Sequence, residues 1–264
     1  MLENHDQPRS VGRFVPDSGP HVELGAKLLA LIKTTLAGTI YLYQGQELGV
    51  RNMPADWPIA EYKDVFSQNY WKKVQEAAKD DPPAERGKKL EHAKFMLQRR
   101  ARDHSRMPMM WDNGANAGFC DDGVEPWMRV HDDYKHINAA TQMKQEDGLS
   151  VYQFWKRGLD NRKKHRGAFV YGGYRGWYVE NESVFAYERW TTGSWGTEEG
   201  QDNEKSRWLI VCNLTDKDVK WEIPQQVRVK SWVAGNYSAS KVEKEVADQI
   251  SLRPWEGVLG VCDY

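Results

Sequence analysis

The pattern of apolar residues changes near residue 167 and divides the chain into two regions of different texture. Before this point, apolar residues recur at helical spacing between long polar stretches. After it, short runs rich in β-branched and aromatic residues are separated by turn residues. These runs cover residues 168–171, 184–190, 208–213, 219–223, 227–234 and 258–262. The second region is therefore expected to be a small antiparallel β-sandwich.

The first region has the alternation of an α/β protein. Its apolar spacing predicts helices over residues 20–36, 61–79, 84–103 and 149–166. Residues 39–43 form a β-rich run without polar alternation, which is typical of a strand buried on both faces of a parallel sheet. Residues 104–149 are rich in glycine, proline and aspartate and are expected to form a long ordered loop. A loop of this length inside a compact domain usually carries function.

Composition limits the compartment and the partners. The formal net charge of −1 gives no electrostatic footprint for nucleic acid or an anionic membrane. Cys120, Cys212 and Cys262 are too few and too widely spaced for a disulfide framework or a metal site, which favours a reducing compartment. No apolar run reaches the length of about 18 residues that a membrane span needs, and no signal peptide is visible. We expect a cytoplasmic protein without a metal or a cofactor.

Two adjacent polar residues lie close to the N-terminus, in the stretch MLENHDQPR. His5 and Asp6 could ligate a metal, orient a substrate or belong to a capping loop. A zinc site would need about three protein ligands, and no suitably spaced partners exist in the sequence. Orientation of a substrate and a structural loop with a hydrogen-bonded histidine both remain open.

Two further stretches carry candidate residues. Glu47 follows the predicted strand, at the end where parallel α/β folds place their sites, and could be an acid, a base or, as we favour, a structural hydrogen-bond acceptor. Arg102 and Arg106 lie in RDHSRMPMMWD, where alternating charges precede an apolar turn. An arginine in such a loop could hold a carboxylate through paired hydrogen bonds.

The order of the motifs is more informative than any one of them. The chain contains, in this order, ENHDQPRSVGRF, GTIYLYQGQELG, RDHSRMPMMWD, NAGF, PWMRV, INAATQ and SVYQFWKRGLDNRKKHRGAFVYGGY. Together these stretches resemble the α-amylase superfamily (glycoside hydrolase family 13), and most of all its α-glucosidase and oligo-1,6-glucosidase branch, of maltase and isomaltase type, as found in fungi. The resemblance covers nearly the whole chain. It implies a retaining hydrolase of α-glucosidic bonds.

The resemblance also implies an α/β plus all-β architecture. The family has a (β/α)8 barrel followed by a C-terminal β-sandwich. Residues 1–167 would then be the last strands and helices of the barrel, and residues 168–264 the sandwich. By the same resemblance, His5 would hydrogen-bond sugar hydroxyls, and Asp6 would be the catalytic carboxylate that stabilises the transition state. Arg102, or alternatively Arg106, would reach the bound sugar.

Some features of the family pattern are absent or changed. Met107 and Met110 stand where family members carry threonine and glutamine. A retaining glycosidase needs two carboxylates about 5–5.5 Å apart, and the family places both before the Asn-His-Asp motif, where this chain has only Met1, Leu2 and Glu3. We therefore expect the isolated chain to be inactive. Its expected partners are an α-linked gluco-oligosaccharide and the missing barrel portion, and neither nucleic acid nor a membrane.

Two alternatives to the hydrolase remain open. The chain could be a non-catalytic β-sandwich module that binds carbohydrate or a protein partner, with Trp177, Trp190 and Trp195 as its aromatic surface. It could also be a truncated gene product without a function of its own.

Overall fold

The computed structural model describes residues 2–145, 150–192, 205–237, 242 and 247–263, and Trp195 lies outside them. The chain forms two compact units. The first, here called the loop unit, comprises Met1–Ser18 and Leu42–Lys144. The second, here called the sheet unit, comprises Gly19–Tyr41 and Gln145–Tyr264. The domain boundary near residue 167 comes from the change in the pattern of apolar residues, and it stays a prediction.

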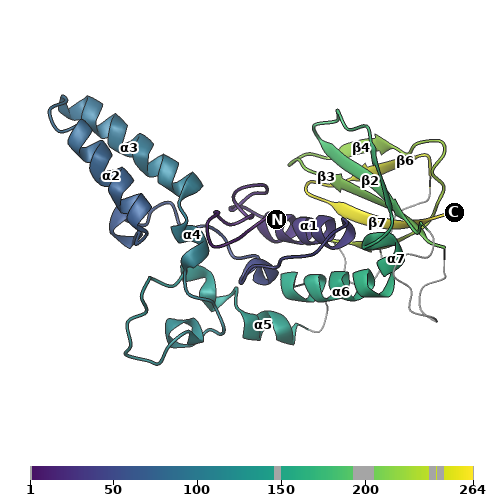
Figure 1. Ribbon diagram of the computed structural model, residues 1–264, viewed down its shortest axis with the longest axis horizontal. Coiled ribbons are helices and arrows are strands. Elements are labelled where there is room, and N and C mark those ends of the chain that lie inside the picture. The colour runs from purple at the N-terminus through teal and green to yellow at the C-terminus, as the bar shows by residue number, and fades with distance from the viewer. Residues whose placement is uncertain (1, 146–149, 193–204, 238–241, 243–246, 264) are drawn as a thin grey trace. The chain divides into compact units, whose positions relative to one another are not determined.

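The sheet unit contains two antiparallel sheets (Figure 1). The larger sheet has the strand order β1-β2-β3-β7-β5, and the smaller pairs β4 with β6. The strands are β1 (Gly173–Trp177), β2 (Val184–Trp190), β3 (Arg207–Asn213), β4 (Val219–Glu222), β5 (Val229–Gly235), β6 (Gln249–Leu252) and β7 (Gly257–Cys262). A buried core joins the sheets, with Leu209 and Val211 from the larger and Trp221, Ile250 and Leu252 from the smaller.

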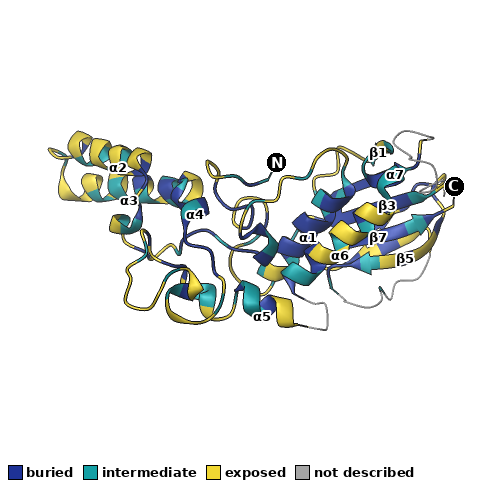
Figure 2. Cartoon of the chain, turned by 60° about the horizontal axis from the view of Figure 1, so that its bottom comes forward, coloured by how far each residue is buried: buried dark blue, intermediate teal, exposed yellow. Residues whose placement is uncertain are grey.

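Helices cover the larger sheet within the same unit. They are α1 (Val22–Thr35), α6 (Val151–Lys164) and the short α7 (Arg166–Phe169). Helix α1 approaches β7 closely because Gly257 has no side chain: a Cβ atom there would lie 2.4 Å from Leu28 Cδ1. The apolar stripe of α1, which includes Leu28 and Leu31, is consequently buried, as Figure 2 shows.

A buried arginine ties the helices of the sheet unit together. Arg162 of α6 donates hydrogen bonds to the carbonyl oxygens of Thr34 (3.1 Å), Leu36 (2.6 Å) and Phe169 (2.9 Å), and also to that of Gly38. Burial lowers the pKa of its guanidinium. The first two acceptors lie at the C-terminal end of α1, where unpaired carbonyl groups and the helix dipole both favour a positive charge.

The loop unit is built from helices and irregular segments. Its helices are α2 (Val65–Ala77), α3 (Pro83–Arg100), α4 (Asp103–Arg106) and α5 (Ala139–Lys144), with 3-10 turns at Gln46–Leu48, Ile59–Glu61, Ala115–Gly118 and Asp132–Lys135. Helices α2 and α3 form a hairpin that is largely exposed (Figures 1 and 2). Asp64 caps α2 by accepting a hydrogen bond from Phe66 N at 2.8 Å. Helices α1, α2, α3 and α6, the four long helices of the described residues, thus match the sequence-based prediction.

Two predicted strands are wrong. Residues 39–43 form no strand, and Tyr41 is 64% exposed. A parallel strand needs hydrogen-bonding neighbours, and no described segment pairs with this one. Residues 168–171 instead finish the short helix α7, because Phe169 N and Val170 N donate to the carbonyls of His165 and Arg166.

Candidate functional site

His5 and Asp6 lie together at the surface of the loop unit. His5 Nε2 is 3.1 Å from Asp6 Oδ2, and the two side chains are 71% and 46% exposed. The turn that carries them is fixed by a hydrogen bond from Asp6 N to Asn4 Oδ1 at 2.8 Å. This turn presents an imidazole and a carboxylate to solvent side by side, where both can exchange hydrogen bonds with a polar ligand.

Both predicted arginines reach Asp6. Arg102 Nη1 lies 3.3 Å and Arg106 Nη2 lies 3.0 Å from Asp6 Oδ1. Arg106 Nε also donates to the carbonyl oxygen of His5 at 3.0 Å. The two arginines are four residues apart across the single turn of α4, a spacing that places their side chains on one side of a helix. The structure therefore brings together His5, Asp6, Arg102 and Arg106, the four site residues that the family resemblance implies.

A second carboxylate, which the sequence analysis missed, faces the same arginines. Asp64 Oδ1 is 3.0 Å from Arg102 Nη2, and Asp64 Oδ2 pairs with Arg106 Nη1. Its side chain is only 4% exposed. Burial raises the pKa of the Asp64 carboxyl. The hydrogen bonds from Arg102 and Phe66 N together lower it by more, so the pKa lies below its usual value. Asp6, Asp64, Arg102 and Arg106 are called the carboxylate–arginine cluster below.

The residues between the two arginines point inward and support the cluster. Asp103, which is buried, accepts hydrogen bonds from Lys63 N (2.6 Å), Asp64 N (2.7 Å) and Ser67 Oγ (2.6 Å). The carboxylate of Asp103 therefore fixes the backbone from which Asp64 projects. In RDHSR, the two terminal arginines thus face the surface, and the three residues between them form a buried support.

His104 is a buried, neutral part of this support. Its Nδ1 accepts a hydrogen bond from Met53 N at 3.1 Å, so its Nε2 carries the proton and donates to Leu97 O at 3.1 Å. Burial lowers the pKa of His104 to about 4. Met107 and Met110, which replace polar residues of the family pattern, are also buried. Apolar side chains suit those positions in this chain.

Glu3 is held in the interior. Its carboxylate is 3.2 Å from Arg9 Nη1 and accepts hydrogen bonds from Ser10 N at 2.8 Å and from Ser10 Oγ. Arg9 also donates to Gln44 O at 2.6 Å. Glu3 and Arg9 are both almost completely buried. This pair joins the N-terminal loop to the segment before Glu47.

Glu47 lies in a tight turn and does not join the cluster. It sits in the 3-10 turn Gln46–Leu48, between Gly45 and Gly49, whose φ angles are 83° and 71°. Its Oε2 atom is buried without a hydrogen-bond partner among the described residues, and burial raises the pKa of its carboxyl. No hydrogen bond or ion pair within the described part of the chain connects Glu47 with Asp6.

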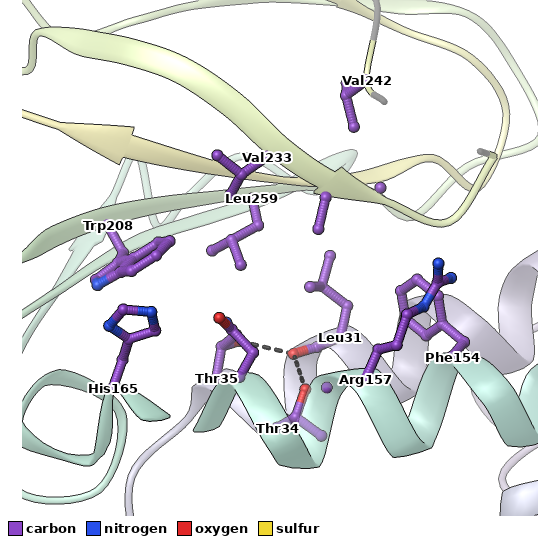
Figure 3. A pocket seen from close by; sticks show the side chains of 14 residues that line it. Leu31, Thr34, Thr35, Phe154, Arg157, His165, Trp208, Val233, Val242 and Leu259 are labelled. Atoms are coloured by element: carbon purple, nitrogen blue, oxygen red, sulfur yellow. Dashed lines mark hydrogen bonds between the residues drawn. The ribbon is translucent and has the colours of Figure 1, made fainter. Parts of the chain in front are cut away.

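A hollow of about 350 Å³ lies within the sheet unit, between α1, α6 and strands β5 and β7. Figure 3 shows its apolar side, which includes Leu31, Val233 and Leu259, and the ring of Trp208 beside that of His165. These two rings are 4.7 Å apart and inclined at 59°. The described residues that line the hollow include no carboxylate, so it offers no acid–base pair.

The described residues contain no group of three or more His, Cys, Asp or Glu side chains suited to hold a metal ion. Within the same residues, no helix is both long and apolar enough to cross a membrane. The carboxylate–arginine cluster offers charged hydrogen bonds to a polar ligand.

Comparison with known proteins places this chain in a family. Residues 1–172 match the alpha-amylase catalytic domain family. The chain is 35% identical over 259 residues to an α-glucosidase of Schizosaccharomyces pombe, a match that covers 98% of this chain and 41% of that protein. It is 32% identical over 257 residues to an oligo-1,6-glucosidase of Parageobacillus thermoglucosidasius, covering 97% of this chain and 41% of that protein. The chain thus spans about two fifths of the length of these relatives.

Solved structures agree with the sequence comparison. An isomaltulose synthase mutant from Erwinia rhapontici NX5, in complex with its natural substrate sucrose, superposes with a TM-score of 0.80 at 28% identity. The match covers 100% of this chain and 42% of that one. Trehalulose synthase MutB from Pseudomonas mesoacidophila MX-45 gives a TM-score of 0.79 at 27% identity, covering 99% and 42%.

Proposed function

Because this chain belongs to the alpha-amylase catalytic domain family, we propose that it forms the sugar-gripping side of the active site of an α-glucosidase-type glycoside hydrolase. The observation that carries this proposal is the carboxylate–arginine cluster, which presents Asp6 and His5 at the surface. Its substrate would be a terminal α-linked glucose unit of a maltose- or isomaltose-like oligosaccharide. The names of the related α-glucosidases and oligo-1,6-glucosidases support this substrate class.

The residues of the cluster and the adjacent His5 would have different roles. Asp6 would accept hydrogen bonds from sugar hydroxyls and stabilise the positive charge that develops on the ring in the transition state. His5 would hydrogen-bond neighbouring hydroxyls. Arg102, or alternatively Arg106, would reach the bound sugar, and both would hold the Asp6 carboxylate, since each donates to it from a side chain that is also tied to Asp64. Asp64 would be a positioning residue.

We place residues 1–167 in the last part of a (β/α)8 barrel and residues 168–264 in a C-terminal β-sandwich. The second assignment is supported by the strand order, since every strand of both described sheets follows residue 168. We also place the protein in the cytoplasm. The unpaired, buried thiols of Cys212 and Cys262 suit a reducing compartment.

Cleavage would need carboxylates from outside this chain. A retaining glycosidase uses two carboxyl groups about 5–5.5 Å apart, one as nucleophile and one as acid and base. Asp64 has a lowered pKa and is bound by two arginines, so it is a poor proton donor. Glu3 is buried and bound by Arg9 and Ser10. We therefore propose that the isolated chain is inactive and that the remaining barrel portion is its partner.

The test compares binding with turnover. The purified chain is titrated with maltose while the imidazole signals of His5 are followed by NMR, and it is assayed in parallel with p-nitrophenyl α-glucoside. We expect weak maltose binding that is lost in Asp6→Asn, and no hydrolysis. Asp56→Asn, an exposed aspartate of the same unit outside the cluster, serves as the matched control.

Three results would bear on separate parts of the proposal. Maltose binding that Asp6→Asn leaves intact would overturn the assignment of the site. Hydrolysis by the isolated chain that Asp6→Asn abolishes would overturn the proposed inactivity. Co-expression with the remaining barrel portion of a related α-glucosidase is expected to yield Asp6-dependent turnover.

A further inference from the structure

A pocket of about 230 Å³ opens on the larger sheet and is lined by Arg175, Glu188, Trp190 and Arg207. It shares no residue with the carboxylate–arginine cluster. Strand register explains how these side chains meet. Arg175 pairs with Glu188, and Trp190 pairs with both Gly173 and Arg207. Because residues two apart on a strand point to the same face, all four side chains lie on one face of the sheet.

The base of the pocket is a buried carboxylate that the neighbouring side chains hold in place. The side chain of Glu188 is 1% exposed. Its Oε1 accepts a hydrogen bond from Arg207 Nε at 2.6 Å, and its Oε2 accepts one from Trp177 Nε1 at 3.0 Å. Each carboxylate oxygen can accept two hydrogen bonds, so each keeps capacity for a further donor.

One wall of the pocket is the indole of Trp190, which lies against the backbone of Gly173. A Cβ atom at Gly173 would come within 2.3 Å of two atoms of that ring, so only glycine leaves room for it. The guanidinium carbon of Arg175 lies 6.0 Å from the centre of the Trp190 ring and 5.4 Å from that of Trp177. The aromatic wall and the arginine are therefore positioned by the sheet itself.

The pocket offers hydrogen-bond donors to a ligand as well as acceptors. Within the described residues, the guanidinium of Arg175 and the Nη atoms of Arg207 make no hydrogen bond to a protein acceptor. The carboxylate of Glu188 would repel a small anion, and the two guanidinium groups would repel a cation. A neutral ring whose hydroxyls both accept and donate avoids both repulsions, and its C–H face can lie on Trp190.

We propose that this pocket binds one pyranose unit of a carbohydrate and is a second sugar site of the protein. Its chemistry selects a neutral polyhydroxylated ring, with hydroxyls accepting from Arg175 and Arg207 and donating to Glu188. The volume suits a single hexose ring. That this unit is an α-linked glucose rests on the proposed function, since a hydrolase of α-glucosides meets such chains at its own active site.

The experiment is an NMR titration of the ¹⁵N-labelled full chain with maltotriose. The indole N–H signal of Trp177 reports on the pocket, because this group donates to Glu188, and Trp177→Phe identifies it. We expect it to shift with a dissociation constant in the range of about 1 mM. Arg175→Ala should weaken binding about tenfold without changing the melting temperature, because Arg175 is exposed. Arg228→Ala, another exposed arginine of the sheet unit, should bind as the wild type does.

Other outcomes overturn defined parts of the proposal. No shift of Trp177, or wild-type binding by Arg175→Ala, would overturn the site. A Trp177 shift with inorganic phosphate equal to that with maltotriose would overturn the selection of a neutral ring. Equal shifts with cellobiose would overturn the α-linked assignment alone. Asp6→Asn should leave the Trp177 titration unchanged, so this site and the proposed active-site function fail or hold separately.

Discussion

The carboxylate of Asp103 accepts a hydrogen bond from the backbone N–H of Asp64 at 2.7 Å. A buried acid thereby positions a second acid, and the second acid binds both arginines that reach Asp6. The exposed part of the candidate site is thus held from behind by a fully buried group. This layered support resembles the arrangement that active sites need to keep a charged side chain at a fixed angle.

Removal of the charge of Asp103 is expected to destabilise the loop unit. Asp103→Ala removes the shared acceptor, so Lys63 N, Asp64 N and Ser67 Oγ all lose their hydrogen-bond partner. We expect a loss of about 3 kcal/mol in the free energy of unfolding, measured by urea denaturation. Ser67→Ala, which removes one of the three bonds, should cost about 1 kcal/mol. Equal losses in the two variants would contradict this account.

Asp64 has two functions that different substitutions can separate. Asparagine caps a helix about as well as aspartate, so Asp64→Asn keeps the cap and removes the negative charge that pairs with Arg102 and Arg106. Because those arginines are partly exposed, we expect a loss of about 1 kcal/mol or less. Asp64→Ala also removes the cap on Phe66 N and should cost about 1 kcal/mol more. Thermal unfolding of both variants measures the difference, and identical curves would rule out the capping role.

His104 makes stability depend on pH between its two pKa values. The ordinary pKa is 6.5 and burial lowers it to about 4 in the folded state. Below pH 6.5 the unfolded chain binds a proton that the folded chain does not, so the free energy of unfolding falls as the pH drops toward 4. The loss amounts to about 3 kcal/mol and stops below that pH. Urea denaturation at a series of pH values measures it.

Two variants test the source of this pH dependence. His104→Asn, which has no titrating ring, should be less stable at neutral pH and should give a shallower curve between pH 6.5 and 4; buried His131, whose pKa burial also lowers, keeps part of the slope. His92→Ala, which removes an exposed histidine of α3, should keep the slope of the wild type. An unchanged slope in His104→Asn would assign the pH dependence to other groups.

Two glycines predict opposite effects of the same substitution. A Cβ atom at Gly172 would lie 2.2 Å from the carbonyl oxygen of Trp190 and 2.4 Å from that of Ala168, and neither backbone atom can move freely. We expect Gly172→Ala to lower stability by about 3 kcal/mol. Gly87 lies within α3 with nothing within 4 Å, so Gly87→Ala should stabilise by about 1 kcal/mol. Melting temperatures that move in the same direction would contradict the steric argument.

Strands with a strong local signal could be predicted from the sequence, and others could not. The sequence places β2 at 184–190 and β3 within one residue, since β-branched and aromatic residues make up about half of each strand. Strand β1 was missed because two of its five residues are glycine. Residues 39–43 have the same local signal as β2 but lack a hydrogen-bonding neighbour in the described chain, and composition does not reveal that lack.

The candidate site was also predictable only in part from the sequence. His5, Asp6, Arg102 and Arg106 follow from motifs in the sequence. Asp64 does not, because its only local signal is an aspartate before a helix, which predicts a cap. Its pairing with Arg102 spans 38 positions of the chain and arises from the hydrogen bonds of Asp103. Contacts between residues so far apart depend on the tertiary structure.

The contact between Gly257 and Leu28 joins a helix near one end of the chain to a strand near the other. During translation, α1 leaves the ribosome long before β7 is synthesised. Until then the part of the apolar side of α1 that packs on Gly257, with Leu28 and Leu31, lacks its cover from β7. Nascent chains expose such surfaces to aggregation and to chaperones. Helix α1 is therefore a segment whose apolar side stays partly uncovered until the end of the sheet unit has been synthesised.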